Sequence, residues 1–315
     1  MASLGRLLCV VGLLLCGAAS LGLCKSHTTA AKNPIIGILM QKCHKEMKNF
    51  GRYYIAASYV KYLESAGARV IPIRERVSVC VYVCVYGGKM HLNWCFRILF
   101  PGGSVDLKRS DYAQVAKIFY DLAIQSYDDG DYFPVWGTCL GFEELTYLVS
   151  GECLLTHTEH TVAVTLPLNF TGGEDGKYSC CFTRQLSKSG THKWRLFIKN
   201  FTLNEKLSKF FSVLTTNRDD KIEFISSMEG YKYPVYGVQW HPEKAPYEWE
   251  KLQGISHEAN AVKTAFYLAE FFVSEARKND HHFESQSEEE KALIYQFRPI
   301  YTGNFSSFQQ CYMFD

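Results

Sequence analysis

Residues 132–145, YFPVWGTCLGFEEL, place a cysteine between two glycines at the junction of two sequence patterns. The apolar run 132–138 is typical of a buried strand, and the segment after Cys139 has the pattern of a helix. A turn that lifts one side chain above the carboxyl edge of a sheet needs small neighbours, because its backbone is strained and closely packed. Gly137 and Gly141 meet that need. The stretch therefore predicts a nucleophile elbow.

Strand-like and helix-like segments alternate through the first half of the chain. The strand-like runs are 34–41, 68–73, 98–103 and 132–138. Apolar residues recur at helical spacing over 52–66, where Gly67 is a predicted C-cap, and again after Ser110, a predicted N-cap. This alternation predicts an α/β fold of parallel βαβ units with helices on both faces of the sheet.

The second half changes character and is mainly strand-like until one long predicted helix. The strand-like segments are 161–168, 193–201, 221–228 and 233–240, and the helix is predicted over 258–278. No internal repeat and no Pro- or Ser-rich linker separates the two halves. We therefore expect residues 25–315 to form a single domain.

Residues 1–24 form a predicted secretory signal peptide. They carry one arginine, an apolar run of about a dozen residues, and then small residues at 17–20. No later stretch reaches the roughly 18 to 20 apolar residues that a membrane helix needs. We expect a soluble, exported protein of the lysosome or the extracellular space. Glycosylation is expected at the sequons of Asn169, Asn200 and Asn304.

Composition narrows the class of protein. The net charge of +2 gives no general attraction to nucleic acid or to an anionic membrane. An aromatic content of 15% and a charged content of 21% fit a packed globular core rather than disorder. Three of the 12 cysteines, Cys9, Cys16 and Cys24, lie in or beside the signal peptide, which leaves an odd number in the mature chain. At least one thiol is therefore unpaired or is paired between chains.

Cys139 has the surroundings of a nucleophile. The dipole and the free amides of a helix N-terminus favour a thiolate and lower the thiol pKa, and the Leu140 N–H can donate to an oxyanion. The candidate base is His241, where a predicted strand ends, and Glu243 can turn back to orient its imidazole. A single buried cysteine is more often a packing residue, and a histidine after a strand is usually structural. The two motifs together are much rarer by chance.

This joint pattern resembles the class I glutamine amidotransferase-like superfamily and, within it, the γ-glutamyl hydrolases. The resemblance covers most of the mature chain, in segments 34–41, 52–68, 98–107, 132–145, 237–249, 257–273 and 295–315. It implies a flavodoxin-like three-layer sandwich with a mostly parallel central sheet and helices on both faces. It also implies a Cys-His-Glu triad at the elbow.

The resemblance carries roles to individual residues. Cys139 would be the nucleophile, His241 the proton donor and base, and Glu243 the residue that orients His241. Backbone N–H groups at Gly103 and Leu140 would bind the oxyanion. Two further residues, Tyr59 and Glu143, fall at positions that the family associates with substrate. For Tyr59 the alternative is core packing, and for Glu143 it is an acid favoured by the helix dipole.

The implied reaction is cleavage of the γ-glutamyl amide bonds of folyl- and antifolyl-poly-γ-glutamates through a γ-glutamyl thioester. It requires no cofactor and no metal. His157 and His160 have H-x-x-H spacing, but no acidic or cysteine partner stands at ligand spacing, so we expect no metal site there. A homodimer is implied only by analogy with the family.

Two segments depart from the family pattern. Residues 75–96 form an aromatic and β-branched run with added cysteines where the family has a polar stretch and an amphipathic helix. Residues 173–191 look shortened and rewritten. Lineage variation is one interpretation, and an alternative or mispredicted exon boundary is the favoured one.

These departures keep two other functions open. One is a catalytically impaired glycoprotein that still binds folate polyglutamates. The other is a glutaminase-type amidohydrolase, which is disfavoured because the chain has no synthetase partner domain and carries a signal peptide.

Overall fold

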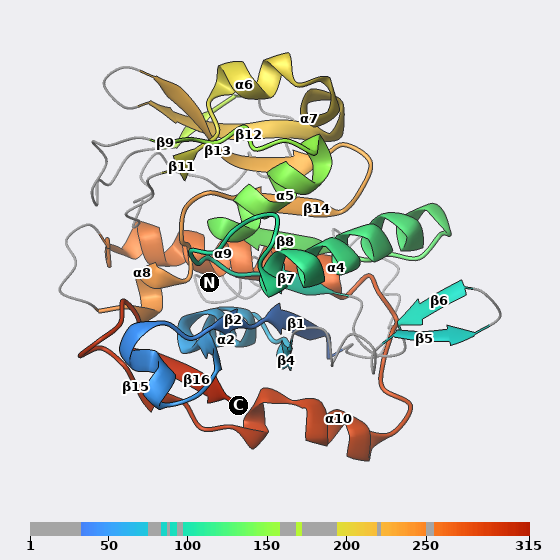
Figure 1. Ribbon diagram of the computed structural model, residues 1–315, viewed down its shortest axis with the longest axis vertical. Helices are drawn as coiled ribbons and strands as arrows, with labels where there is room; N and C mark the ends of the chain where they lie inside the picture. Colours follow the sequence, from blue (N-terminus) through green and yellow to red (C-terminus); the bar gives the residue numbers. More distant parts are fainter. Residues whose placement is uncertain are drawn as a thin grey trace, which may run out of the picture. The chain divides into compact units, whose positions relative to one another are not determined.

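Five parallel strands form the centre of the structure, a computed structural model. In spatial order they are β4 (Arg69–Ile73), β1 (Ile35–Leu39), β7 (Ile98–Phe100), β8 (Val135–Thr138) and β14 (Val235–Val238). Numbered along the chain, this order is 2-1-3-4-5, the flavodoxin-like arrangement. The predicted flavodoxin-like sheet is therefore confirmed (Figure 1).

The structure describes residues 33–74, 83–86, 89–92, 97–157, 168–171, 194–218, 222–249 and 255–315. Residues Asn33–Asp315 form one compact unit. The predicted signal peptide and its boundary at residue 24 lie outside the described residues.

Three antiparallel strands extend the sheet beyond β14. They are β13 (Glu223–Gly230), β12 (Phe211–Arg218) and β10 (Asn169–Phe170), in that order. The predicted strand over 221–228 corresponds to β13. The predicted strand over 161–168 lies almost entirely outside the described residues.

Helices cover both faces of the sheet, as predicted. Successive residues of a strand point to opposite faces, and the core divides in the same way. On β7, Ile98 and Phe100 pack with α4 (Asp111–Asp128) and α5 (Leu140–Ser150). Leu99 packs with α2 (Ala57–Glu64) and α9 (Ala259–Ala276). All three residues of β7 are buried, which explains why this strand reads as a continuous apolar run.

Two local predictions were wrong. The predicted helix over 52–66 begins only at Ala57, because Tyr53–Ala56 form β3, which pairs with the C-terminal strand β16 (Gln310–Phe314). This partner lies more than 250 residues away in sequence, so local spacing could not reveal it. The predicted strand over 193–201 is two residues of β11 followed by α6 (Ile198–Leu203), whose Phe201 is buried in the core.

The predicted N-cap at Ser110 is confirmed, whereas the C-cap of α2 is Ser65, two residues before the predicted Gly67. The Ser110 side chain accepts a hydrogen bond from the Ala113 N–H at 3.1 Å and caps α4. Gly67 follows α2 with φ of +86°, a conformation that favours glycine.

The remaining elements are smaller. They are β2 (Gln41–Lys42), η1 (Lys45–Asn49), β5 (Val83–Tyr86), β6 (Lys89–Leu92), β9 (Thr156–His157), β11 (Trp194–Arg195), α7 (Glu205–Phe210), α8 (Lys244–Tyr247), α10 (Gln286–Ala292), η3 (Ile294–Gln296) and β15 (Ile300–Tyr301). A second sheet has the order β15-β16-β3-β2. Strands β5 and β6, within the divergent segment 75–96, pair with each other. The divergent segment 173–191 lies outside the described residues.

The described cysteines and helices bear on two further expectations. Cys43, Cys153 and Cys311 are free thiols, and the Cys139 thiol is buried; Cys153 alone among these four cysteines is exposed. Across the described ranges, no helix has both the length and the apolar character to cross a membrane.

Helix α5 carries a carboxyl group that makes stability depend on pH. Glu144 is fully buried, and neither of its oxygens has a hydrogen-bond partner among the described residues. Burial, with the nearby Asp106 and Glu143 carboxyls, raises the pKa of Glu144 to about 8. The native state therefore keeps a proton that the unfolded chain releases above its lower pKa of about 4.3.

We expect the free energy of unfolding to fall as the pH rises from about 5 to about 7.5, by up to about 1.4 kcal/mol per pH unit from this group. Glu144→Gln should reduce this change in the free energy of unfolding, measured by urea denaturation at about pH 5 and about pH 7.5. Glu270→Gln, which alters a largely exposed carboxyl, is the control. An unchanged pH dependence in Glu144→Gln would contradict the assignment.

Candidate active site

The elbow around Cys139 is a tight junction of β8 and α5. Cys139 has φ of +56° and ψ of −105°, a strained conformation for a non-glycine residue. A Cβ atom at Gly137 would lie 2.5 Å from the Gly141 carbonyl oxygen, and one at Gly141 would lie 2.8 Å from the Phe100 carbonyl carbon. Both glycines are required by close backbone approach, as the sequence predicted.

Strand pairing brings His241 to the elbow. β14 runs parallel to β8 with Val238 opposite Thr138, and the Cys139 N–H donates to the Val238 carbonyl at 2.8 Å. His241 follows three residues later. A Cβ atom built on Gly102 would lie 2.6 Å from His241 Cε1 and 3.0 Å from Cys139 Cβ, so the two side chains border the same small space.

Glu243 holds the imidazole of His241. Its Oε1 lies 2.6 Å from His241 Nδ1, and both side chains are buried. A carboxylate at Nδ1 favours the tautomer with the proton on that nitrogen. Nε2, on the other side of the ring, then carries the lone pair that accepts a proton. The predicted orienting role of Glu243 requires this contact and stays a prediction.

Burial controls the charge of the resting site. It raises the pKa of the Cys139 thiol well above its ordinary value, and the nearby Glu143 carboxyl raises it further. Lys244 and the N–H groups of Gly103 and Leu140 lower the same pKa but are outweighed. Burial, with Lys244, lowers the pKa of His241 well below 6.5.

The predicted lowering of the Cys139 pKa by the helix N-terminus was therefore wrong in net direction. The amides act as predicted, but desolvation of the thiolate is the larger effect. The resting site holds a neutral thiol and a neutral imidazole.

The predicted oxyanion donors surround the sulfur. The N–H groups of Gly103, after β7, and Leu140, at the start of α5, both hydrogen-bond the Cys139 thiol. They therefore converge from two elements on the position where a bond to the sulfur would form.

The two predicted substrate residues differ in position. Glu143 is buried at the wall of the pocket, where it accepts a hydrogen bond from Gln239 Nε2 at 3.0 Å. Its burial raises its pKa to about 7. Tyr59 is only 2% exposed and is not part of the pocket lining. Its hydroxyl accepts a hydrogen bond from the Gly102 N–H at 2.8 Å and lies 3.3 Å from His241 Nδ1.

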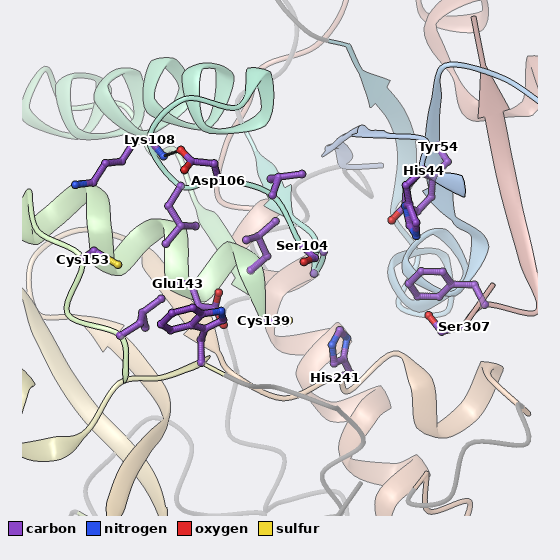
Figure 2. Close-up of a pocket in the computed structure, with 18 of the residues that line it drawn as sticks. His44, Tyr54, Ser104, Asp106, Lys108, Cys139, Glu143, Cys153, His241 and Ser307 are labelled. Carbon is purple, nitrogen blue, oxygen red and sulfur yellow. Dashed lines mark hydrogen bonds between the residues drawn. The ribbon is translucent and has the colours of Figure 1, made fainter. Parts of the chain in front are cut away.

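A pocket of about 620 Å³ opens over Cys139, Glu143 and His241. Figure 2 shows Cys139 and His241 between two walls, one with Lys108, Asp106 and Cys153 and the other with His44, Tyr54 and Ser307. The pocket is also lined by Lys244 and Trp194, which sequence reasoning did not single out. The sequence could have indicated Lys244 as a pocket residue, because it directly follows the predicted site residue Glu243.

The described residues include no cluster of three or more His, Cys, Asp or Glu side chains arranged to hold a metal ion. The His157 ring packs edge-on against Trp194 with centroids 5.1 Å apart, and His160 lies outside the described residues. Among the sequons, Asn169 and Asn304 are exposed. Asn200 is half-buried, and its Nδ2 donates to the Leu154 carbonyl at 3.0 Å.

Comparison with known proteins identifies the family. Residues 96–253 match the family model described as glutamine amidotransferase class-I. The chain is 70% identical to the γ-glutamyl hydrolase of Homo sapiens and 62% identical to that of Bos taurus, with the whole of each chain covered. It is 35% identical to γ-glutamyl hydrolase B of Dictyostelium discoideum, over 92% of this chain and 86% of that protein. The chain belongs to the γ-glutamyl hydrolase family.

Membership of the γ-glutamyl hydrolase family confirms the resemblance seen in the sequence. The match to the amidotransferase model spans β7, β8 and β14, the strands that carry Gly103, Cys139 and His241. Cys139, His241, Glu243 and the two backbone donors thus lie in the part of the chain that matches this model, whereas the pocket residues His44, Tyr54 and Ser307 lie outside it.

The raised pKa of Cys139 predicts its reactivity. At about pH 7 the thiol is protonated, so labelling by iodoacetamide should be slow and should rise about tenfold per pH unit toward pH 9 without a plateau. The measurement is mass spectrometry of the Cys139 peptide in a Cys153→Ser background, which removes the exposed thiol. A plateau reached below about pH 7 would show a thiolate at rest and refute the prediction.

Proposed function

We propose that this protein is a cysteine hydrolase that cleaves γ-glutamyl amide bonds. One observation carries the proposal: Cys139 lies beside the His241–Glu243 pair in an open pocket, in a chain 70% identical to the human γ-glutamyl hydrolase. The arrangement supplies a nucleophile, a base and two backbone donors.

The first half of the reaction forms an acyl-enzyme. The Cys139 sulfur attacks the γ-amide carbonyl while its proton moves to His241 Nε2, because the resting thiol is neutral. The N–H groups of Gly103 and Leu140 stabilise the tetrahedral oxyanion. His241 then protonates the leaving amine as the C–N bond breaks, which leaves a γ-glutamyl thioester.

The second half releases the product. Water attacks the thioester and gives a proton to His241, and the C–S bond breaks with return of that proton to the sulfur. Every proton is carried by His241, and the Glu243 carboxyl keeps its ring in one orientation throughout. These steps use only groups of this chain and need no cofactor.

The pocket suits folyl- and antifolyl-poly-γ-glutamates. Lys244 and Lys108 line it and can attract the carboxylates of a glutamate chain, while Trp194, Phe308 and Leu155 supply aromatic and apolar surface. Lys244 is only 8% exposed, so its charge acts in a partly desolvated setting where an ion pair is stronger than in water.

The two alternative functions have less support. A glutaminase-type activity is expected to release ammonia from free glutamine, and a binding-only glycoprotein is expected to bind folate polyglutamates without turnover. The curated relatives that match the whole chain carry the name γ-glutamyl hydrolase, which favours the hydrolase.

The decisive experiment is turnover of a defined folyl-poly-γ-glutamate by the purified chain, with products separated by length. Cys139→Ala should lower kcat by at least about a thousandfold, because it removes the sulfur on which the thioester forms. Cys153→Ser removes a thiol at the same pocket and should keep activity. Substantial turnover by Cys139→Ala would exclude the assigned nucleophile.

We also propose that the protein enters the secretory route and reaches the lysosome or the extracellular space as a glycosylated homodimer. The sequence of residues 1–24 and the exposed sequons at Asn169 and Asn304 support this route, and family analogy alone supports the dimer. Expression in mammalian cells should give a secreted chain that loses mass on endoglycosidase treatment. Retention in the cytosol without glycans would refute the route, and light scattering would test the dimer.

A further inference from the structure

The backbone segment 101–103 connects β7 to the site. Side chains from other parts of the chain form hydrogen bonds with its backbone C=O and N–H groups. The Tyr112 hydroxyl donates to the Pro101 carbonyl at 2.9 Å. The Gly102 N–H donates to the Tyr59 hydroxyl at 2.8 Å, and the Gly102 carbonyl accepts from Gln41 Nε2. Both polar groups of Gly102 are therefore held by buried side chains.

The hydrogen bond from Gln41 to the Gly102 carbonyl sets the direction of the Gly103 N–H. In a trans peptide the C=O and the following N–H point in opposite directions, and the described chain contains no cis peptide bond. A Gly102 carbonyl turned toward Gln41 thus aims the Gly103 N–H the other way, toward the sulfur of Cys139. A flipped peptide would present its carbonyl to the oxyanion instead and repel it.

This peptide has little conformational restraint of its own. It joins two glycines, which rotate more freely than any other residue. Neither glycine can be replaced to stiffen it, because a Cβ at Gly102 would lie 2.6 Å from His241 Cε1 and one at Gly103 would lie 2.6 Å from Gln41 Nε2. Neighbouring side chains must therefore supply the restraint.

Gln41 and Tyr59 are themselves held in place. Gln41 is 4% exposed, and its Oε1 accepts from the Tyr54 hydroxyl at 3.3 Å, which turns the amide NH₂ toward Gly102. The Tyr59 hydroxyl, as acceptor from Gly102, also hydrogen-bonds Glu243 and lies 3.3 Å from His241 Nδ1. Tyr59 thus links the Gly102–Gly103 peptide to the His241–Glu243 pair.

We propose that Gln41 and Tyr59 are positioning residues that lock the Gly102–Gly103 peptide with the Gly103 N–H aimed at the oxyanion. The proposal rests on the proposed γ-glutamyl hydrolysis. Gln41 acts through the backbone of Gly102, and Tyr59 acts through that backbone and through its contact with the His241–Glu243 pair. Their loss should therefore weaken binding of the transition state and leave binding of the substrate nearly unchanged.

The test compares Gln41→Met and Tyr59→Phe with the wild-type chain in three measurements. Turnover of a folyl-poly-γ-glutamate gives kcat and KM. A γ-glutamyl aldehyde reports the oxyanion site, because the Cys139 sulfur bonds its carbonyl carbon, the thiol proton moves to His241, and the carbonyl oxygen becomes an oxyanion. Iodoacetamide labelling of Cys139 forms no oxyanion, so it depends on the Gly103 N–H only through the smaller lowering of the thiol pKa.

Each variant should lower kcat by about a hundredfold to a thousandfold, the range for loss of one oxyanion donor, with KM changed by no more than about twofold. Affinity for the aldehyde should fall by a similar factor, and the labelling rate should fall by much less than kcat. An unchanged kcat or aldehyde affinity would overturn the proposal, and so would a labelling rate that falls in parallel with kcat.

Two further variants separate positioning from general damage. Tyr62→Phe removes a buried hydroxyl from α2, the helix that carries Tyr59. That hydroxyl has no hydrogen-bond partner among the described residues, so the Tyr62→Phe variant should have wild-type kinetics. Gln41→Glu can donate to the Gly102 carbonyl only when protonated, so its kcat relative to wild type should rise as the pH falls. A pH-independent ratio would overturn the role of the Gln41 donor.

Failure of the proposed function gives a different result. A wild-type chain without turnover would refute γ-glutamyl hydrolysis. Loss of aldehyde affinity in Gln41→Met, relative to that wild-type chain, would still support the locked peptide.

Discussion

The hydrogen bond between the Cys139 N–H and the Val238 carbonyl is the contact on which the site depends. It continues the parallel pairing of β8 and β14 by one residue, into the strained turn itself. The nucleophile and the strand that leads to His241 are thereby fixed to each other by backbone, which is more rigid than any side-chain contact. Because the turn is strained, this pairing must hold it on one side while the packing of Gly141 against Phe100 holds it on the other.

Burial gives the site its chemical character. Cys139, His241 and Glu243 are each nearly or fully inaccessible to solvent, so every charge that appears during the reaction appears in a medium of low polarity. That environment keeps the resting thiol and imidazole neutral. It also makes the N–H groups of Gly103 and Leu140 more effective toward an oxyanion than they would be in water. The same desolvation that suppresses the thiolate therefore favours the transition state.

The sequence predicted those features that depend on short-range pattern. The elbow around Cys139, the histidine at the end of a strand, and the alternation of strands and helices were all visible in local spacing. What it missed depends on distant partners. Tyr53–Ala56 form a strand because β16 lies beside them, and Gln41 acts on Gly102 across 61 positions of sequence. The sign of the Cys139 pKa shift was missed because it is a property of the complete burial of the thiol, not of its own helix.

The topology explains how the divergent segment 75–96 bears on the site. This segment joins β4 to β7, and the chain after β7 leads directly into the Gly102–Gly103 peptide. β7 is paired on both sides, with β1 and β8. Just before its first residue, buried Arg97 donates to the Ala276 carbonyl at 2.6 Å, and the Arg97 carbonyl accepts from Gly37. β7 is therefore anchored by parts of the chain outside the divergent segment.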